Sequence, residues 1–262
     1  MKSRFALRLA TAAGMLGLWA CSKDSTSPSA SLIDQSTLTT DVASSSGDAV
    51  ALDVATISTN ESFAGLTAPI VGAPAAVSGD SIIYTRTRTC YDSTGASTTC
   101  GTSAVRTAVL HVTFAGFRTD TAENGAVFSG ALSRTVLDTL FRNYTAGVET
   151  SRTHDGLSTG TDTASFAGPN VTRTYDEAGS DSVEAVTYDL PRSTNPWPIS
   201  GKIVRNVSIH ATFQNATRSD TTDVTKRVEV DFPADNEGNV VLKIDAKTCN
   251  LNLVNHRVTN CQ

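Results

Sequence analysis

Aromatic side chains are scarce in this chain, at 6% of 262 residues with only two tryptophans. Large aromatic side chains contribute much of the buried area in many protein cores. Their scarcity therefore predicts a thin core, or a sheet with one solvated face. Thr, Ser and Val are abundant instead. That composition favours half-buried strands over helices.

Clustered positive charge is also lacking. The chain has 21 Lys and Arg against 26 Asp and Glu, a formal net charge of −5, and its cations are scattered along the sequence. Proteins that bind nucleic acid gather Lys and Arg on one face or along one helix. We therefore expect no nucleic-acid partner.

Several sequence motifs of common active sites are absent. The chain contains no Ser-x-x-Lys pair, no HExxH and no Gly-rich phosphate loop. His154-Asp155 is an adjacent histidine–carboxylate pair, but neighbours along a strand point to opposite faces, so we interpret it as a turn. We predict no catalytic residue, no metal site and no cofactor. A hydrolase with carboxylates at two strand ends stays a weaker alternative.

The N-terminal stretch carries the most specific signal. Lys2, Arg4 and Arg8 precede an apolar run over residues 9–20. The run is shorter than the roughly 20 residues of a membrane-spanning helix, and it fits the apolar region of a secretory signal peptide. It ends in Leu18-Trp19-Ala20-Cys21. This tetrad resembles the lipobox of bacterial lipoproteins, with Trp19 where a small residue is usual.

The resemblance implies a lipid anchor. In this family the signal peptide, here residues 1–20, is cleaved before the cysteine, and Cys21 receives diacylglycerol and an N-acyl chain. Two or three chains hold a protein stably on a membrane, whereas one chain binds only marginally. The next residue is Ser22 rather than Asp, and in this family that favours the outer membrane over retention at the inner membrane.

Two further regions follow the lipidated cysteine. Residues 21–46 are rich in Ser, Thr and Asp, and we predict a flexible tether there. We predict a single antiparallel β domain over residues 47–262. A short helix over 47–60 would place Val50, Val54 and Ile57 on one side, although a strand also fits, since apolar residues alternate there.

Most of the β domain shows a period of two. The clearest face consists of Ile203, Arg205, Val207, Ile209, Ala211 and Phe213, and similar alternation occurs over 109–114, 227–232 and 240–247. Such alternation is typical of antiparallel sheets with one packed face. The predicted fold class is mainly β: an antiparallel meander, open barrel or sandwich-like sheet, with one short N-terminal helix as an option. Gly-containing pairs predict turns at 94–95, 124–125, 155–156, 178–179 and 237–239.

Four cysteines remain besides Cys21, and an even number in an exported chain predicts disulfides. Three pairings are available. We favour Cys90–Cys100 and Cys249–Cys261, because each pair brackets one predicted hairpin.

Three other features invite functional readings. The oxygen-rich loop Asp231, Asp235, Asn236, Glu237 and Asn239 lacks the calcium-loop order, so we predict a plain hairpin turn. Trp197 lies between two prolines, and we favour a core position over an exposed binding anchor. Tyr91 and Tyr175, each in Tyr-Asp-x-x-Gly, either meet a ligand or pack over a hairpin.

These observations predict a lipid-anchored protein of the bacterial outer membrane, with a non-catalytic domain that binds an apolar ligand or lipid. A structural or protein-interaction module of the envelope is the alternative. The expected partners are the membrane, through the anchor, and an apolar ligand or an envelope protein. The ligand-binding residues are not identified by the sequence.

Overall fold

The computed structural model describes residues 31–66, 81–121, 127–168 and 170–262. This part of the chain forms one helix and eleven strands. In chain order they are α1 (Gln35–Phe63), β1 (Ser81–Tyr91), β2 (Ser97–Thr98), β3 (Thr107–Thr121), β4 (Val127–Thr145), β5 (Val148–Ala167), β6 (Thr172–Asp189), β7 (Ser200–Gln214), β8 (Ser219–Asp231), β9 (Asn239–Ile244), β10 (Lys247–Asn252) and β11 (Arg257–Thr259).

All strands belong to one antiparallel sheet with the order β11-β10-β9-β8-β7-β6-β5-β4-β3-β1-β2. From β3 onward each strand pairs with the next one in the chain, so the sheet is a meander. In the described residues β11 and β2 form its two edges, and the sheet does not close. The predicted mainly-β antiparallel fold with a helix is therefore confirmed.

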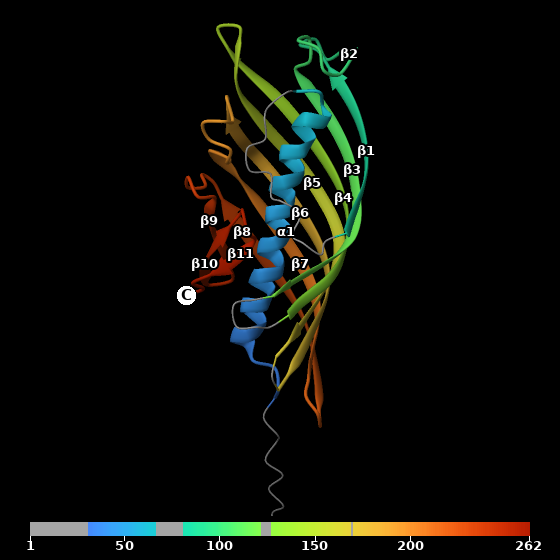
Figure 1. Cartoon of the computed structure of the whole chain (residues 1–262), viewed down its shortest axis with the longest axis vertical. Helices are drawn as coiled ribbons and strands as arrows, with labels where there is room; N and C mark the ends of the chain where they lie inside the picture. The colour runs from blue at the N-terminus through green and yellow to red at the C-terminus, as the bar shows by residue number, and fades with distance from the viewer. Residues whose placement is uncertain (1–30, 67–80, 122–126, 169) are drawn as a thin grey trace, which may run out of the picture. The chain divides into compact units, whose positions relative to one another are not determined.

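Helix α1 lies along the hollow side of this curved sheet, which wraps around it (Figure 1). Its polar sequence shows no amphipathic pattern, yet residues on every side of the helix are buried, from Leu38 to Glu61. Asp34 caps its N-terminus by accepting hydrogen bonds from the backbone of Ser36 and Thr37.

The helix is longer than predicted. It has 29 residues, so Gln35–Ser46, which we assigned to the tether, is helical. Ser, Thr and Asp have low intrinsic helix propensity, and for that reason the composition suggested a coil. Packing overrides propensity here, because Leu38 and Val42 are fully buried against the sheet.

The predicted alternation matches the two faces of the sheet. The inward residues of β7, Ile203 to Phe213, are all buried, as are Val228, Val230, Val240, Leu242 and Ile244 on β8 and β9. With the apolar residues of α1 they form the main core. A second set of alternating residues, mainly Ser and Thr, points outward.

Two predicted turns are wrong, because the glycines involved lie inside strands. Asp155-Gly156 lies at a β-bulge in β5, and Ala178-Gly179 lies in the middle of β6. Glycine also marks bulges and close backbone approach, and those uses apply here. Gly95 and Gly238 do lie in turns with positive φ, whereas 124–125 lies outside the described residues.

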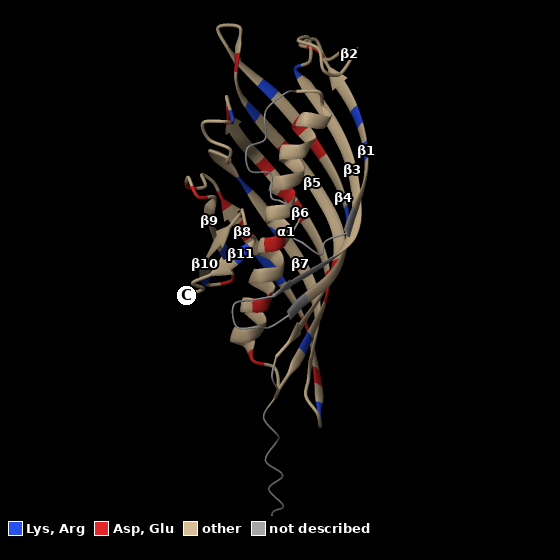
Figure 2. Ribbon diagram, viewed as in Figure 1, with Lys and Arg blue, Asp and Glu red and all other residues tan. Residues whose placement is uncertain are grey.

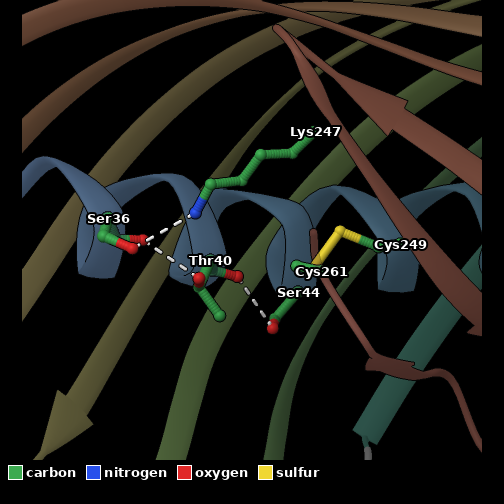
Figure 3. Close-up of a disulfide and its surroundings, with 6 residues drawn as sticks. All are labelled: Ser36, Thr40, Ser44, Lys247, Cys249 and Cys261. Atoms are coloured by element: carbon green, nitrogen blue, oxygen red, sulfur yellow. Dashed lines mark hydrogen bonds between the residues drawn. A yellow bond between two sulfur atoms is a disulfide. The ribbon is translucent and has the colours of Figure 1, made fainter.

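Both favoured disulfides are confirmed. Cys90–Cys100 joins β1 to the segment after β2, and Cys249–Cys261 joins β10 to the residues after β11. Figure 3 shows the second bridge beside the first turns of α1, where Lys247 donates a hydrogen bond to Ser36. The bridges fasten both ends of the sheet.

Candidate functional site

Charge is segregated between α1 and the sheet. The helix carries Asp41, Asp48, Asp53 and Glu61 and no Lys or Arg, so its ribbon in Figure 2 shows only acidic bands. Each acid meets a basic group of the sheet side: Asp41 with Arg173, Asp48 with His256, Asp53 with Arg134, and Glu61 with Arg152. The helix is therefore held by contacts between acidic and basic side chains along its length as well as by apolar packing.

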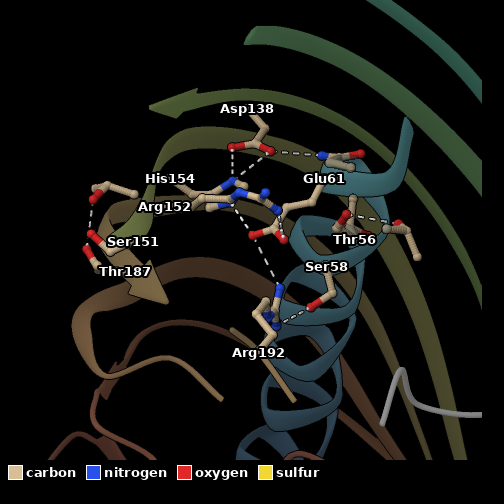
Figure 4. A network of polar contacts seen from close by, with 12 residues as sticks. Thr56, Ser58, Glu61, Asp138, Ser151, Arg152, His154, Thr187 and Arg192 are labelled. Atoms are coloured by element: carbon tan, nitrogen blue, oxygen red, sulfur yellow. Dashed lines mark hydrogen bonds and ion pairs between the residues drawn. The ribbon is translucent and has the colours of Figure 1, made fainter. Parts of the chain in front are cut away.

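A first buried polar cluster lies near the C-terminal end of α1 (Figure 4). This Glu61 cluster consists of Glu61, Asp138, Glu149, Arg152, His154 and Arg192. Glu61 accepts a hydrogen bond from Arg152 at 2.9 Å and pairs with Arg192 at 3.3 Å. His154 Nδ1 lies 3.1 Å from both Asp138 oxygens, and its Nε2 lies 3.4 Å from Glu61.

The carboxylates of the Glu61 cluster are all matched by cations: Arg152, His154 and Arg192 face Glu61, Asp138 and Glu149, and Arg142 also pairs with Glu149. Burial opposes ionisation of Glu61, but the hydrogen bond from His154 and the charges of Arg192 and Arg152 lower its pKa to about 2. Burial likewise opposes a charged His154, but Asp138 and Glu61 raise the pKa of the imidazole to about 9. At neutral pH His154 is thus a cation that donates from both ring nitrogens.

A second buried cluster lies beside the middle of α1. This Asp53 cluster consists of Asp53, Arg134, Asp162, Glu177, Asp181 and Arg205. Arg134 reaches Asp181 at 2.8 Å, Asp162 at 3.0 Å and Asp53 at 3.3 Å. Arg205 reaches Asp162 at 2.8 Å, Asp181 at 3.2 Å and Glu177 at 3.4 Å. The two guanidinium groups therefore share four carboxylates.

Strand glycines make room for these two arginines. A Cβ at Gly160 would lie 2.3 Å from the Ser133 carbonyl oxygen and 2.6 Å from Arg134 Cγ. A Cβ at Gly179 would lie 2.8 Å from a guanidinium nitrogen of Arg205. These glycines, one of them predicted as a turn residue, are needed for side-chain packing inside the sheet.

Protonation in the Asp53 cluster differs from that in the Glu61 cluster. Burial and the charge of Asp181 raise the pKa of Asp53 to about 8, against the opposing pull of Arg134 and Arg205. Burial also raises the pKa of Glu177. The pKa of Asp162, in contrast, is lowered: Arg134 and Arg205 together outweigh its desolvation. Protonated and ionised carboxyl groups thus lie side by side.

Such a pair is the chemistry of general acid–base catalysis, but access is missing. The side chains of Asp53 and Asp181 are 3% and 2% exposed, and Asp162, the most accessible member, is 17% exposed. The cavity next to Arg134 and Asp162 measures about 20 Å³, room for one water molecule. The arrangement connects α1 to β4, β5, β6 and β7 through Asp53, Arg134 and Arg205.

The outward face of the sheet offers a different surface. Two adjoining grooves of about 530 and 550 Å³ cross β4 to β8 and share residues. Their exposed outward-facing side chains, here named the hydroxyl groove, are mainly small and hydroxylated: Ser133, Thr135, Thr159, Thr161, Ala178, Ser180, Asn206, Ser208 and Thr225. Asp176, His210 and Asp223 form a polar row at one margin. Small side chains leave the centre of this groove hollow, and its charged side chains lie at the margin.

The sequence-predicted site residues have varied outcomes. Cys21 lies outside the described residues. His154-Asp155 is not a turn, because His154 lies in β5 and is fully buried. Trp197 is 6% exposed and packs in the main core, which confirms its core position.

The two Tyr-Asp-x-x-Gly motifs and the oxygen-rich loop lie in different parts of the sheet. Tyr175 points inward, is buried, and donates a hydrogen bond to Asp41 of α1. Tyr91 ends β1, next to the hairpin that leads to β2. Asp235 closes the predicted hairpin turn by accepting hydrogen bonds from the backbone of Glu237 and Asn239.

Sequence reasoning missed both buried clusters. One signal was available: Arg205 stands among five apolar residues on the inward face of β7, where an arginine needs a buried partner. Its partners come from β5 and β6, whose inward faces mix Gly, Ser and acids. No local pattern connects those residues to an acidic helix more than a hundred positions earlier.

No helix among the described residues is long and apolar enough to cross a membrane. Comparison with known proteins finds no matching family model, no similar curated protein and no similar solved structure.

Proposed function

We propose that this protein is a lipid-anchored envelope protein whose β domain is a non-catalytic interaction module that binds through the outward face of its sheet. The proposal is supported by the difference between the two faces of the sheet. The hollow side of the sheet is filled by α1 and its ion pairs, whereas the outward face is open and grooved.

The anchor in this proposal depends on the lipobox-like tetrad ending at Cys21. Two disulfides support an oxidising, exported environment. The proposal includes no catalytic step, and it assigns the buried carboxyl groups Asp53, Glu61, Asp138, Glu177 and Asp181 to the contact between α1 and the sheet.

The anchor is tested with Cys21→Ser. We expect the parent to fractionate with membranes and carry an acyl mass on its mature first residue, and the variant to lose both. Identical processing and fractionation of the two proteins, without an acyl mass, contradicts the anchor.

The binding face is tested by photocrosslinking in intact cells. A photoreactive residue at Ser208, in the hydroxyl groove, should give a discrete crosslinked product. The same residue at Thr113, which is exposed on β3 outside the groove, is the matched control. Ala178→Arg should abolish the Ser208 product. Equal labelling from both positions, or no effect of Ala178→Arg, argues against the groove as a binding face.

An apolar ligand under the sheet is a second candidate. The inward wall of β7 to β9 is apolar, with Ile203, Val207 and Leu242 fully buried, and it would accept an acyl chain if α1 moved away. Mass spectrometry of the delipidated protein and uptake of an apolar dye test this candidate. Absence of both a bound ligand and dye uptake rules it out.

A further inference from the structure

The Asp53 cluster contains more buried acid than base. Four carboxyl groups surround two guanidinium groups, and five of these six side chains are at most 3% exposed. Two uncompensated negative charges would remain if every carboxyl group were ionised. Unpaired charges in a protein interior are costly, and the usual remedy is to bind protons.

The contacts indicate where such protons reside. Asp53 lies on α1, and its Oδ2 is buried without a hydrogen-bond partner. Arg134 of β4, Asp162 of β5, Glu177 and Asp181 of β6 and Arg205 of β7 are the charged groups of the sheet in this cluster. Glu177 accepts a hydrogen bond from Ser45 of α1 at 2.6 Å and is only distantly paired with Arg205, at 3.4 Å.

Both of these carboxyl groups lie at the contact between helix and sheet. If α1 leaves the sheet, water reaches them, and their protons dissociate as they do from an ordinary carboxylic acid. We propose that docking of α1 onto the sheet takes up protons at Asp53 and Glu177, so that the helix is a proton-coupled latch that loosens as the pH rises.

The direction follows from linkage. The docked state holds protons that the undocked state has already released above about pH 4, so rising pH favours undocking. For one such proton, with a pKa of about 8 for docked Asp53, the opening constant of α1 rises on the order of 50-fold between pH 6 and pH 8. His154 adds to this rise, because its pKa is raised from 6.5 to about 9 partly by Glu61 of α1, and its proton also dissociates more readily once the helix has left.

Hydrogen exchange of the α1 backbone amides in the full chain measures the opening constant, once the pH dependence of the intrinsic exchange rate is removed. Asp53→Asn replaces the protonated carboxyl group with a neutral amide of the same shape. We expect the parent to show the rise and Asp53→Asn to lose on the order of 50-fold of it. Asp223→Asn removes a carboxylate from the outward face, where Asp223 pairs with His210, and should behave like the parent.

Three results overturn the proposal. They are a parent opening constant that changes less than twofold between pH 6 and pH 8, an undiminished rise in Asp53→Asn, and an equal loss in Asp223→Asn. If Asp53→Asn does not fold, as judged by circular dichroism, Glu177→Gln takes its place, and an undiminished rise in that variant overturns the proposal. The latch is independent of the proposed binding face, so crosslinking from Ser208 has no bearing on it.

Discussion

The two clusters under α1 use the same residue types with opposite charge balance. In the Glu61 cluster, cations are at least as numerous as carboxylates, and the pKa values of Glu61 and His154 keep both of these groups ionised at neutral pH. In the Asp53 cluster, carboxyl groups outnumber guanidinium groups by two to one, and protons make up the difference. The comparison teaches that an ion pair observed in a structure does not reveal how it responds to mutation or pH; the local charge count does.

The largest expected effect is in the Glu61 cluster. Glu61→Gln removes the charge that Arg152, His154 and Arg192 share, and leaves buried cations short of a partner. We expect a loss of about 3–5 kcal/mol in the free energy of unfolding at pH 7, measured by urea denaturation. A loss below about 1 kcal/mol would show that the cations find other partners.

The second-largest effect is expected at low pH, where the Glu61 cluster should lose stability. The pKa of Glu61 is lowered from 4.5 to about 2, so its stabilisation is present above pH 4.5 and is lost as the pH falls toward 2. The free energy of unfolding should fall by on the order of 3 kcal/mol over this pH range. The melting temperature should fall steeply between pH 5 and pH 2 in the parent and less steeply in Glu61→Gln. Equal slopes in the two proteins would show that Glu61 does not cause the loss of stability in acid.

A medium effect is expected where a glycine makes room for an arginine. Gly160→Ala pushes Arg134 and the Ser133 carbonyl away from residue 160. We expect this overpacking to lower the free energy of unfolding by about 1–3 kcal/mol. Ser180→Ala, an exposed change on the neighbouring strand, is the control and should stay within about 0.5 kcal/mol. If Gly160→Ala is equally mild, Arg134 has more freedom than its contacts indicate.

The smallest effect should come from the amide substitution in the other cluster. Burial raises the pKa of Glu177, so Glu177→Gln replaces a carboxyl group whose charged form is disfavoured with a neutral amide. We expect a change below about 1 kcal/mol at pH 7, read from the same urea curves as Glu61→Gln. Equal losses in the two Gln variants would erase the contrast between the clusters.

The sequence predicted the sheet far better than the helix. Alternation in β7, β8 and β9 depends on one burial rule that applies residue by residue, so the inward faces could be predicted. Both disulfides could be predicted because each pair brackets one hairpin. Helix α1 lacks a continuous apolar stripe, because many of its buried side chains are polar and contact charged or hydroxyl side chains of the sheet. Gly156 and Gly179 were wrongly predicted to lie in turns, because glycine is favoured both in turns and where groups pack closely inside a strand.

The candidate site was harder to predict for a related reason. Arg134, Arg205 and Asp181 are ordinary charged residues of a strand until the meander brings β4, β6 and β7 beneath the same helix. Their roles depend on pairing across strands and on protonation, and neither leaves a local signature.

The absence of cations in α1 has a practical consequence for protein chemistry. Between Lys23 and Arg86 the chain contains no Lys and no Arg, so trypsin has no cleavage site in the helix, whether it is docked or free. A trypsin-resistant helix therefore says nothing about docking. A protease that cleaves at acidic residues attacks Asp41, Asp53 and Glu61 themselves, and its cutting pattern directly reports whether the sheet protects them.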